Sequence, residues 1–358
     1  MKTRLKIFAI VIALVFGGIF LAEPGKSQSK TETAGQKFKS IKVLNDMPAD
    51  QMGKVMNMMS ASLGVDCKFC HASNDGDYEK DGNENKETAR KMIKMVFDLN
   101  KTQFNGRPEI NCNSCHNGRS HPQPSFPLTA AVPALQRPEQ PTKKPTVDEI
   151  IAKYETALGG RTSLEEVTSR IIKSTRVEPD GKTTEPETIY LKGGKYASDT
   201  TYDKYVVREV FDGVVGQKFG MADPIELKPD EKEQIKREAE MFSPANLKLT
   251  FPKMDYRSAD RIDGKDVYLV LATTAGNLRE RLYFDVMSGL LVRRIASSPT
   301  VFGNFVYQVD YSDYKDFGGV KLPTTTKYAV PHIQWTRKIS EVKNNVPVDD
   351  GVFGPVKK

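Results

Sequence analysis

Long hydrophobic runs are missing from this sequence beyond residue 22, and the 358 residues are 38% hydrophobic and 28% charged. This composition excludes a protein with multiple membrane spans and is typical of soluble globular domains. Clusters of basic residues interleaved with aromatics are also missing, because Lys and Arg are scattered among nearly as many Asp and Glu. We therefore expect no nucleic-acid partner. The net charge of +7 instead favours binding to acidic proteins or to anionic membrane surfaces.

The N-terminus has the pattern of an export segment. Lys2, Arg4 and Lys6 precede an apolar stretch from Ile7 to Leu21, and a polar segment follows. The apolar stretch is short for a membrane span, which favours a cleaved signal peptide. The cleavage site around Ala22 is poorly defined, however, which favours an uncleaved anchor. We therefore expect residues 1–22 to be a signal peptide or an N-terminal anchor. No cysteine follows directly, which excludes a lipid-modified N-terminal Cys. The sequence predicts a periplasmic or otherwise extracytoplasmic protein.

The length and the changes in composition predict two domains joined by a linker. The first domain is expected to be small and mainly helical. The second is expected to be an antiparallel β-sheet or open half-barrel with one N-terminal helix, which makes the fold class two-domain α + β. The predicted boundaries are a tether over residues 23–40, a first domain over 41–128, a Pro-rich linker over 129–146 and a second domain over 147–358.

Two helices are predicted in the first domain, and each ends shortly before a pair of cysteines. In the first helix the apolar residues follow one face, and Gly64 is a plausible C-cap. The second runs from about Lys86 to Asn100 and follows a polar loop. The domain is thus a twofold repeat of helix, loop and Cys-x-x-Cys-His. The apolar positions of the first helix are Met52, Met56, Met59 and Leu63.

The second domain begins with a capping box at Thr146 and Glu149, which predicts a helix through Leu158. Beyond Ser169 the pattern changes to short alternating runs separated by Gly-containing turns. The predicted strands are Arg170–Arg176, Thr188–Lys192, Lys204–Phe211, Leu247–Phe251, Val267–Thr273, Arg279–Phe284, Leu290–Ile295, Val306–Tyr311 and Thr324–Tyr328.

All four cysteines of the chain lie in two Cys-x-x-Cys-His motifs. In this motif both thiols add across the vinyl groups of a haem, and the adjacent imidazole takes one axial position on the iron. A disulfide does not explain the His after each pair, and a thioredoxin-like dithiol needs a strand–helix unit. A zinc site has acceptable spacing, but exported proteins seldom keep four free thiolates. We therefore predict two covalently bound haem c groups, attached at Cys67, Cys70, Cys112 and Cys115, with His71 and His116 as iron ligands.

The opposite axial ligand is best sought among the methionines. The remaining histidines are His121, which is close to His116 in sequence, and His332, which lies in the other domain. The helices before the motifs are rich in Met, although each of these side chains could equally be a flexible core residue. The pattern alone does not select among Met52, Met56, Met58 and Met59 before the first motif, or between Met92 and Met95 before the second.

The segments from Met56 to His71, Ala89 to Asn100 and Cys112 to Gly118 resemble the photosynthetic reaction-centre cytochrome c subunit family. The resemblance covers roughly residues 41–128. It implies a multihaem cytochrome c domain in which a Met of each preceding helix is an axial ligand, and by position these residues are Met56 and Met92. Members of that family carry four haems in two such pairs, whereas this chain has one pair. The resemblance implies a redox protein as partner, such as a membrane electron-transfer complex or a reaction centre.

The C-terminal region loosely resembles periplasmic lipoprotein-carrier-like domains, which implies an incomplete barrel able to bind a hydrophobic ligand. The residues that carry this resemblance are the helix from Asp148 to Gly160 and the hairpin from Tyr283 to Arg293. A plain interaction or spacer domain is an equally valid interpretation, because a fold does not fix a function.

We expect a periplasmic dihaem electron carrier rather than an enzyme, and two alternatives stay open. A two-haem peroxidase-like enzyme would need one haem with an open sixth position, which the Met-rich helices disfavour. A lipid- or lipoprotein-binding protein with a haem accessory domain would carry co-purified lipid.

Overall fold

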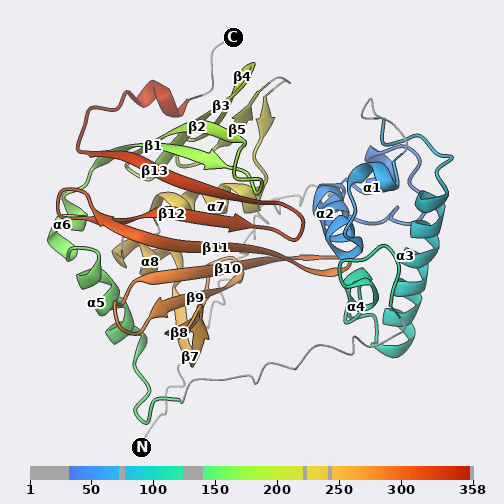
Figure 1. The fold of residues 1–358 in the computed structure, drawn as a ribbon, viewed down its shortest axis with the longest axis horizontal. Helices are drawn as coiled ribbons and strands as arrows, with labels where there is room; N and C mark the ends of the chain where they lie inside the picture. Colours follow the sequence, from blue (N-terminus) through green and yellow to red (C-terminus); the bar gives the residue numbers. More distant parts are fainter. Residues whose placement is uncertain (1–31, 72–76, 124–139, 221–223, 241–243, 355–358) are drawn as a thin grey trace, which may run out of the picture.

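The computed structural model describes residues 32–71, 77–123, 140–220, 224–240 and 244–354 (Figure 1). The predicted signal or anchor over residues 1–22 lies outside the described residues, as do the first part of the tether and residues 129–139 of the predicted linker. No described helix combines the length and the apolar character that a membrane span requires.

The N-terminal part of the chain is helical. Its two main helices agree with the prediction. Gly64, in a left-handed conformation (φ +64°), is the C-cap of α2, and Asn83 is the N-cap of α3, where its side chain accepts from Asn85 N at 2.8 Å. The helices and 3-10 turns of this region are α1 (Ala34–Lys37), η1 (Ala49–Gln51), α2 (Met52–Leu63), η2 (Cys67–Phe69), α3 (Glu84–Gln103) and α4 (Cys112–His116).

Part of the predicted tether is folded into this helical unit. Thr33 starts α1 with a capping box, Ala34 is fully buried, and Phe38 packs against the same apolar cluster as α2 and α3. Ordered structure therefore begins before Ile41. The tether was predicted because this short segment has too few apolar residues to show a period, although its few apolar side chains are core residues.

The C-terminal part is built on one 13-stranded antiparallel sheet, so the predicted open antiparallel sheet is confirmed. Its order is β6-β5-β4-β3-β2-β1-β13-β12-β11-β10-β9-β8-β7, which means that β1 joins two successive meanders by pairing with β13. The strands are β1 (Ser169–Val177), β2 (Thr184–Lys192), β3 (Lys195–Tyr202), β4 (Tyr205–Phe211), β5 (Gly216–Phe219), β6 (Ile225–Glu226), β7 (Lys253–Ile262), β8 (Lys265–Thr273), β9 (Arg279–Asp285), β10 (Leu291–Thr300), β11 (Gly303–Asp316), β12 (Lys321–Ala329) and β13 (Gln334–Asn344).

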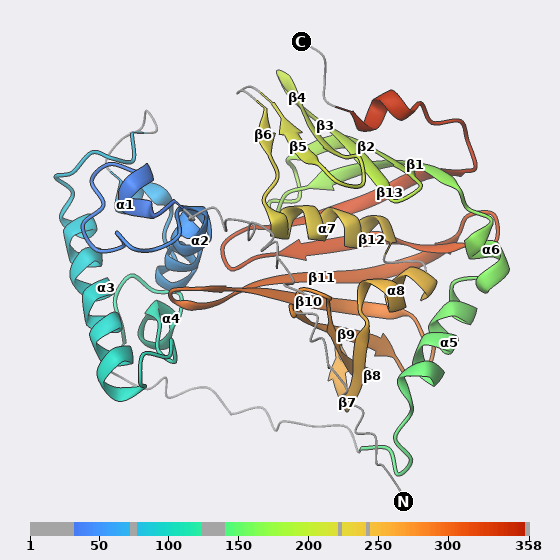
Figure 2. The same cartoon turned by 180° about the vertical axis from the view of Figure 1, so that it is seen from behind.

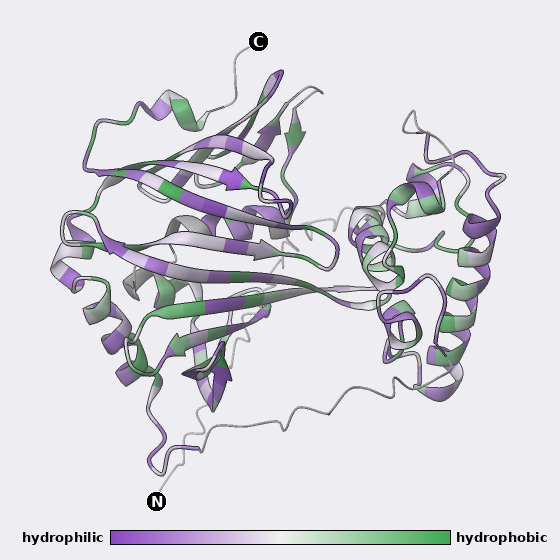
Figure 3. Cartoon of the chain, viewed as in Figure 1, coloured by the Kyte–Doolittle hydropathy of each residue, from purple (hydrophilic) through white to green (hydrophobic). Residues whose placement is uncertain are grey.

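Helices cover one face of this sheet (Figure 2). The predicted capping box is present, since Thr146 Oγ1 accepts from Glu149 N at 3.1 Å at the start of α5. Figure 3 shows hydrophilic and hydrophobic residues alternating along the strands. This alternation gives the sheet an apolar face on which the helices pack. Tyr154 and Phe251 are almost fully buried between the helices and the sheet. The helices here are α5 (Val147–Ala157), α6 (Arg161–Glu165), α7 (Pro229–Glu240) and α8 (Pro244–Thr250), followed by the 3-10 turn η3 (Asp350–Phe353).

One predicted strand is wrong, and several elements were not predicted. The segment Leu247–Phe251 lies largely in α8, because its buried residues Leu247 and Phe251 are one helical turn apart while Leu249 is 80% exposed. Short apolar runs fit both periods, and the packing of the helix on the sheet decides between them. The prediction also omitted α1, α6, α7, β3, β5, β6, β7 and β13. The sheet domain therefore has more helices than the single N-terminal one that was predicted.

Candidate haem-binding site

The first Cys-x-x-Cys-His motif lies where α2 ends against α4. Gly64 is required there, because a Cβ at this residue would lie 2.2 Å from the carbonyl oxygen of Gly118. Gly118 N donates to Ser62 O at 2.8 Å, which joins the two halves of the repeat. Asp66 then caps η2 by accepting from Lys68 N at 3.1 Å, and this short turn presents Cys67.

His71 is held in an orientation that suits a metal ligand. Its Nδ1 lies 3.1 Å from the carbonyl oxygen of Tyr78, and the Tyr78 ring meets the imidazole edge-on at 5.1 Å. When Nδ1 donates to this carbonyl, the lone pair of the ring is on Nε2. Burial lowers the pKa of His71, and the hydrogen bond to the Tyr78 carbonyl, which raises the pKa, offsets only part of this effect. The lowered pKa favours the neutral imidazole, which is the form that binds metals.

A cavity of about 340 Å³ lies beside this motif. Its size is within the range of small-molecule and cofactor sites. The structure thus brings Met56 together with Cys67, Cys70 and His71, since all four line the cavity. The rest of the wall comes mainly from apolar side chains, namely Phe38, Ile41, Val43, Leu44, Met52, Met59, Leu63, Val65, Ala89 and Ile93.

This mainly apolar lining would suit a porphyrin, with Cys67 and Cys70 as the residues that would attach it. Burial raises the pKa of Cys70, as it does for Cys112, so both thiols favour the protonated form. All four cysteines are unpaired, and no group of three or more His, Cys, Asp or Glu among the described residues is placed to hold a metal ion.

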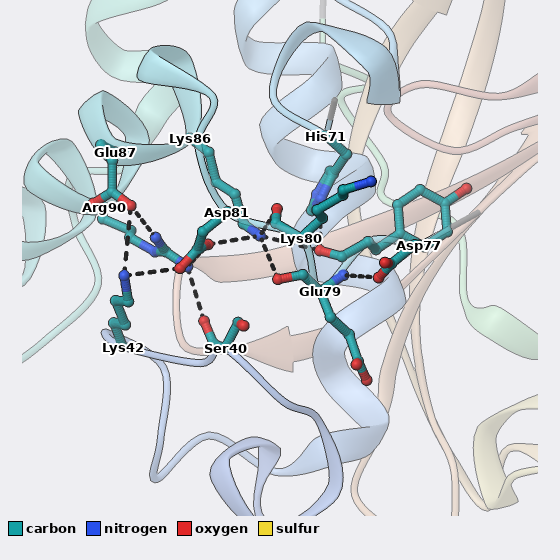
Figure 4. A network of polar contacts seen from close by, with 11 residues as sticks. Ser40, Lys42, His71, Asp77, Glu79, Lys80, Asp81, Lys86, Glu87 and Arg90 are labelled. Atoms are coloured by element: carbon teal, nitrogen blue, oxygen red, sulfur yellow. Dashed lines mark hydrogen bonds and ion pairs between the residues drawn. The ribbon is translucent and has the colours of Figure 1, made fainter. Parts of the chain in front are cut away.

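A network of charged residues lies beside the cavity (Figure 4), and Lys42, Lys86 and Arg90 of this network line it. Asp81 is the centre of this network, since Arg90 Nη2 and Lys86 Nζ lie 2.8 and 3.1 Å from its Oδ1, and Lys42 Nζ lies 2.8 Å from its Oδ2. Hydrogen bonds from Arg90, Lys42 and Lys86 hold the pKa of Asp81 well below its usual range. Lys86 Nζ also donates to three successive backbone carbonyls, which begin with Tyr78 O at 3.1 Å. The network therefore fixes the loop whose carbonyl orients His71.

The second motif forms α4 and repeats the arrangement of the first. Asn111 caps this helix by accepting from Asn113 N at 3.0 Å. The buried side chain of Asn100 exchanges two hydrogen bonds with the backbone of Ile110, at 2.7 and 3.0 Å, and so ties the end of α3 to the start of α4. His116 Nδ1 lies 2.9 Å from the carbonyl oxygen of Arg119, just as His71 faces Tyr78.

Met92 is not buried in the core of the helical unit. Met92, Met95 and Leu99 are 38, 42 and 37% exposed along α3, the helix that packs on α4. Such a row of exposed apolar side chains is typical of a surface that a bound group or a partner covers. The remaining histidines, His121 and His332, are exposed. The sequence pattern did not predict that residues 38–44 line the first cavity. Their only sequence signal is a loose series of apolar residues before α2.

A second cavity, of about 290 Å³, lies in the sheet domain and has polar walls. Arg337 and Glu187 form a buried ion pair there, with Nε and Oε2 2.6 Å apart, and Lys218 pairs with Glu209 at 2.7 Å. An acyl chain would replace the hydration of such groups without forming hydrogen bonds. The predicted hydrophobic ligand of this domain therefore finds no support in this cavity.

Solved structures similar to this chain match its C-terminal part. A LolA superfamily protein from Nitrosomonas europaea is 13% identical, with a TM-score of 0.42, and the match covers 59% of this chain and 99% of that one. A putative outer membrane lipoprotein-sorting protein domain from Vibrio parahaemolyticus is 8% identical, with a TM-score of 0.39, over 57% of this chain and 94% of that one. These chains are of the type that the C-terminal region was predicted to resemble.

The helical part matches cytochromes. The photosynthetic reaction center cytochrome c subunit of Roseobacter denitrificans is 31% identical in an alignment of 101 residues, and the match covers 25% of this chain. This chain spans only 27% of the length of that relative. Residues 20–154 match the family described as photosynthetic reaction centre cytochrome C subunit. The predicted resemblance of the first domain to this family is confirmed.

Proposed function

We propose that this chain is a periplasmic or otherwise extracytoplasmic dihaem c-type cytochrome that carries electrons. The observation that supports this most directly is the cavity that gathers Met56, Cys67, Cys70 and His71 within apolar walls. The family match over residues 20–154 gives independent support for a cytochrome. A bound haem would supply the one-electron iron couple at each site.

The roles of the residues follow from their chemistry. The thiols of Cys67 and Cys70 would anchor the first haem and those of Cys112 and Cys115 the second. His71 and His116 would be the proximal ligands, each with its Nδ1 facing a backbone carbonyl that stabilises the required tautomer. On the opposite side, Met56 would be the ligand of the first haem iron and Met92 that of the second.

The charged network beside the first cavity adds a further role. Lys42, Lys86 and Arg90 line the cavity and carry three positive charges beside Asp81 and Glu87. Haem propionates are carboxylates, which pair well with arginine and lysine. We expect these cations to hold the propionate edge while Asp81 keeps them in place.

The redox partner that this function requires is a protein. A membrane electron-transfer complex or a reaction centre is the candidate that the family match favours. The N-terminal segment would keep the protein near the membrane as an anchor, or release it into the periplasm when cleaved as a signal peptide.

A spectroelectrochemical titration of the full-length holoprotein tests the proposal against the peroxidase-like alternative. An electron carrier with methionine on both irons should show two reversible one-electron steps and little turnover of peroxide, because its sixth positions are filled. Rapid peroxide turnover with an open sixth position on one haem would contradict the carrier function. Co-purified lipid at one molecule per chain would favour the lipid-binding alternative.

A further inference from the structure

The β10–β11 hairpin extends out of the sheet to the helical unit (Figures 1 and 2). The two strands pair as far as Thr300 and Gly303, so the tip consists of Val301 and Phe302. Gly303 has a φ of +99°, a conformation that glycine adopts readily, and this closes the two-residue turn. In both views the tip lies beside α2 and α4.

Phe302 is a core residue of the helical unit, although it belongs to the sheet in sequence. Its side chain is 1% exposed and shares an apolar cluster with Val55, Ile93 and Val96 of α2 and α3. Its ring stacks on that of Phe97 in α3, with centroids 5.1 Å apart and planes inclined by 14°. The helical unit therefore depends on a side chain supplied from the other part of the chain.

Polar contacts fix the tip in this position. Val301 N donates to the side-chain oxygen of Gln51 at 3.1 Å, and Thr300 Oγ1 lies 3.6 Å from the sulfur of Met58. A neighbouring loop adds a further contact, in which His332 N donates to the side-chain oxygen of Asn57 at 3.1 Å. These bonds attach the sheet to α2 at several points.

Asn111 links the tip to the second cysteine motif. Its side-chain oxygen caps α4 by accepting from Asn113 N, while its Nδ2 donates to the carbonyl oxygen of Phe302 at 3.4 Å. Asn111 directly precedes Cys112. Phe302 thus contacts α3, which carries Met92, and also the residue that starts α4.

We propose that the tip of the β10–β11 hairpin, Val301 and Phe302, is a positioning element for the second haem site. It fixes α3 relative to α4, and so fixes Met92 relative to Cys112, Cys115 and His116. The sheet domain then acts on electron transfer through this contact. This inference rests on the proposed function, because it requires a haem at the second motif.

The test uses the full-length holoprotein and compares three variants with a matched control. Phe302→Ala removes the ring, and Phe302→Leu keeps much of the packing. Asn111→Ser keeps a good helix cap and removes only the donor to Phe302. The control is Met287→Ala, which truncates an 87% exposed side chain in the turn at the other end of β10.

The measurements are the potential of each haem and its near-infrared sulfur-to-iron band, assigned with a Met92→Ala variant. We expect Phe302→Ala to shift the potential of the second haem more than that of the first and to weaken its band. Phe302→Leu should restore most of the band. Asn111→Ser should change the second haem alone, and this holds even when Phe302→Ala fails to fold.

Two results would overturn the inference while leaving the proposed function intact. In the first, the Phe302 and Asn111 variants carry two haems whose potentials and bands equal those of Met287→Ala. In the second, both haems shift by the same amount, which a general loss of stability would cause. A wild-type protein without covalent haem would instead overturn the proposed function, and this inference with it.

Discussion

The cysteine and histidine residues of the two motifs were identifiable from the sequence, whereas the methionines were not. The two Cys-x-x-Cys-His motifs contain every cysteine of the chain, and this pattern favours haem attachment over a disulfide or a zinc site. By contrast, α2 contains Met52, Met56, Met58 and Met59, and all four contact the same apolar cluster. The choice of Met56 and Met92 comes from the family resemblance and stays a prediction.

Replacement of these methionines tests the axial ligands. Met56→Ala should remove the near-infrared sulfur-to-iron band of one oxidised haem and Met92→Ala that of the other, and each haem should lose potential because thioether ligation raises it. Met95→Ala is the matched control on α3 and should leave both bands in place. Unchanged bands in the first two variants would show that the assignments are wrong.

Gly64 is a second residue whose role can be measured. Gly64→Ala places a Cβ 2.2 Å from Gly118 O at a left-handed backbone position, so it should cost more than about 2 kcal/mol in the free energy of unfolding. Gly53→Ala is the control, because nothing lies within 4 Å of its Cβ in α2, and this change should stabilise by up to about 1 kcal/mol. Urea unfolding monitored by circular dichroism compares the two, and equal stabilities would contradict the account.

At the scale of elements, capping residues and turns were predicted well and weakly patterned segments were not. Gly64, Thr146 and the turn from Asp285 to Gly289 end or begin the elements as expected. The helix α7 was missed because its described buried residues are only Ile235 and Arg237, which give no apolar period. Its position on the sheet, in contact with β3 and β4, is a tertiary property.

The loop before α3 should respond to pH through Asp81. The pKa of Asp81 is depressed in the folded protein, so its contribution to stability is complete above about pH 5 and is lost as the pH falls below the unfolded value of about 3.9. Asp81→Asn should therefore lower the melting temperature at pH 7 and have a smaller effect at pH 3. Asp98→Asn, an exposed residue of α3, is the control and should cost less at pH 7. A difference between Asp81→Asn and the wild type that does not depend on pH would contradict this role.

At the scale of the whole molecule, the sequence predicts two parts but not how they join. The hairpin tip at Phe302 is about 200 residues from Phe97 in sequence, and nothing in its local pattern distinguishes it from an exposed turn. Burial of Phe302 in the helical unit depends on the length of β10 and β11, since these strands run past the rest of the sheet. Only the folded chain shows this contact.

The sheet is crosslinked by a buried ion pair between β2 and β13. Burial would raise the pKa of Glu187, but the charge and hydrogen bonds of Arg337 hold it below its usual value. Arg337→Met leaves a buried carboxylate without its partner and should cost about 3–5 kcal/mol at pH 7. The cost should shrink at pH 4, because the carboxylate can then take a proton. Urea unfolding at both values of pH checks this, and adding Glu187→Gln should recover part of the loss.

Intact mass spectrometry combined with an alkaline pyridine haemochrome assay tests the central claim most directly. The protein is produced through an export pathway with cytochrome c maturation and extracted with acid–acetone, which removes haem that is not covalently bound. We predict a mass increase of two haems that survives extraction, and an increase of one haem when Cys67 and Cys70, or Cys112 and Cys115, are both replaced by Ser. A wild-type protein with no covalent haem would contradict the proposed dihaem cytochrome. The four cysteines would then be interpreted as disulfide partners or zinc ligands.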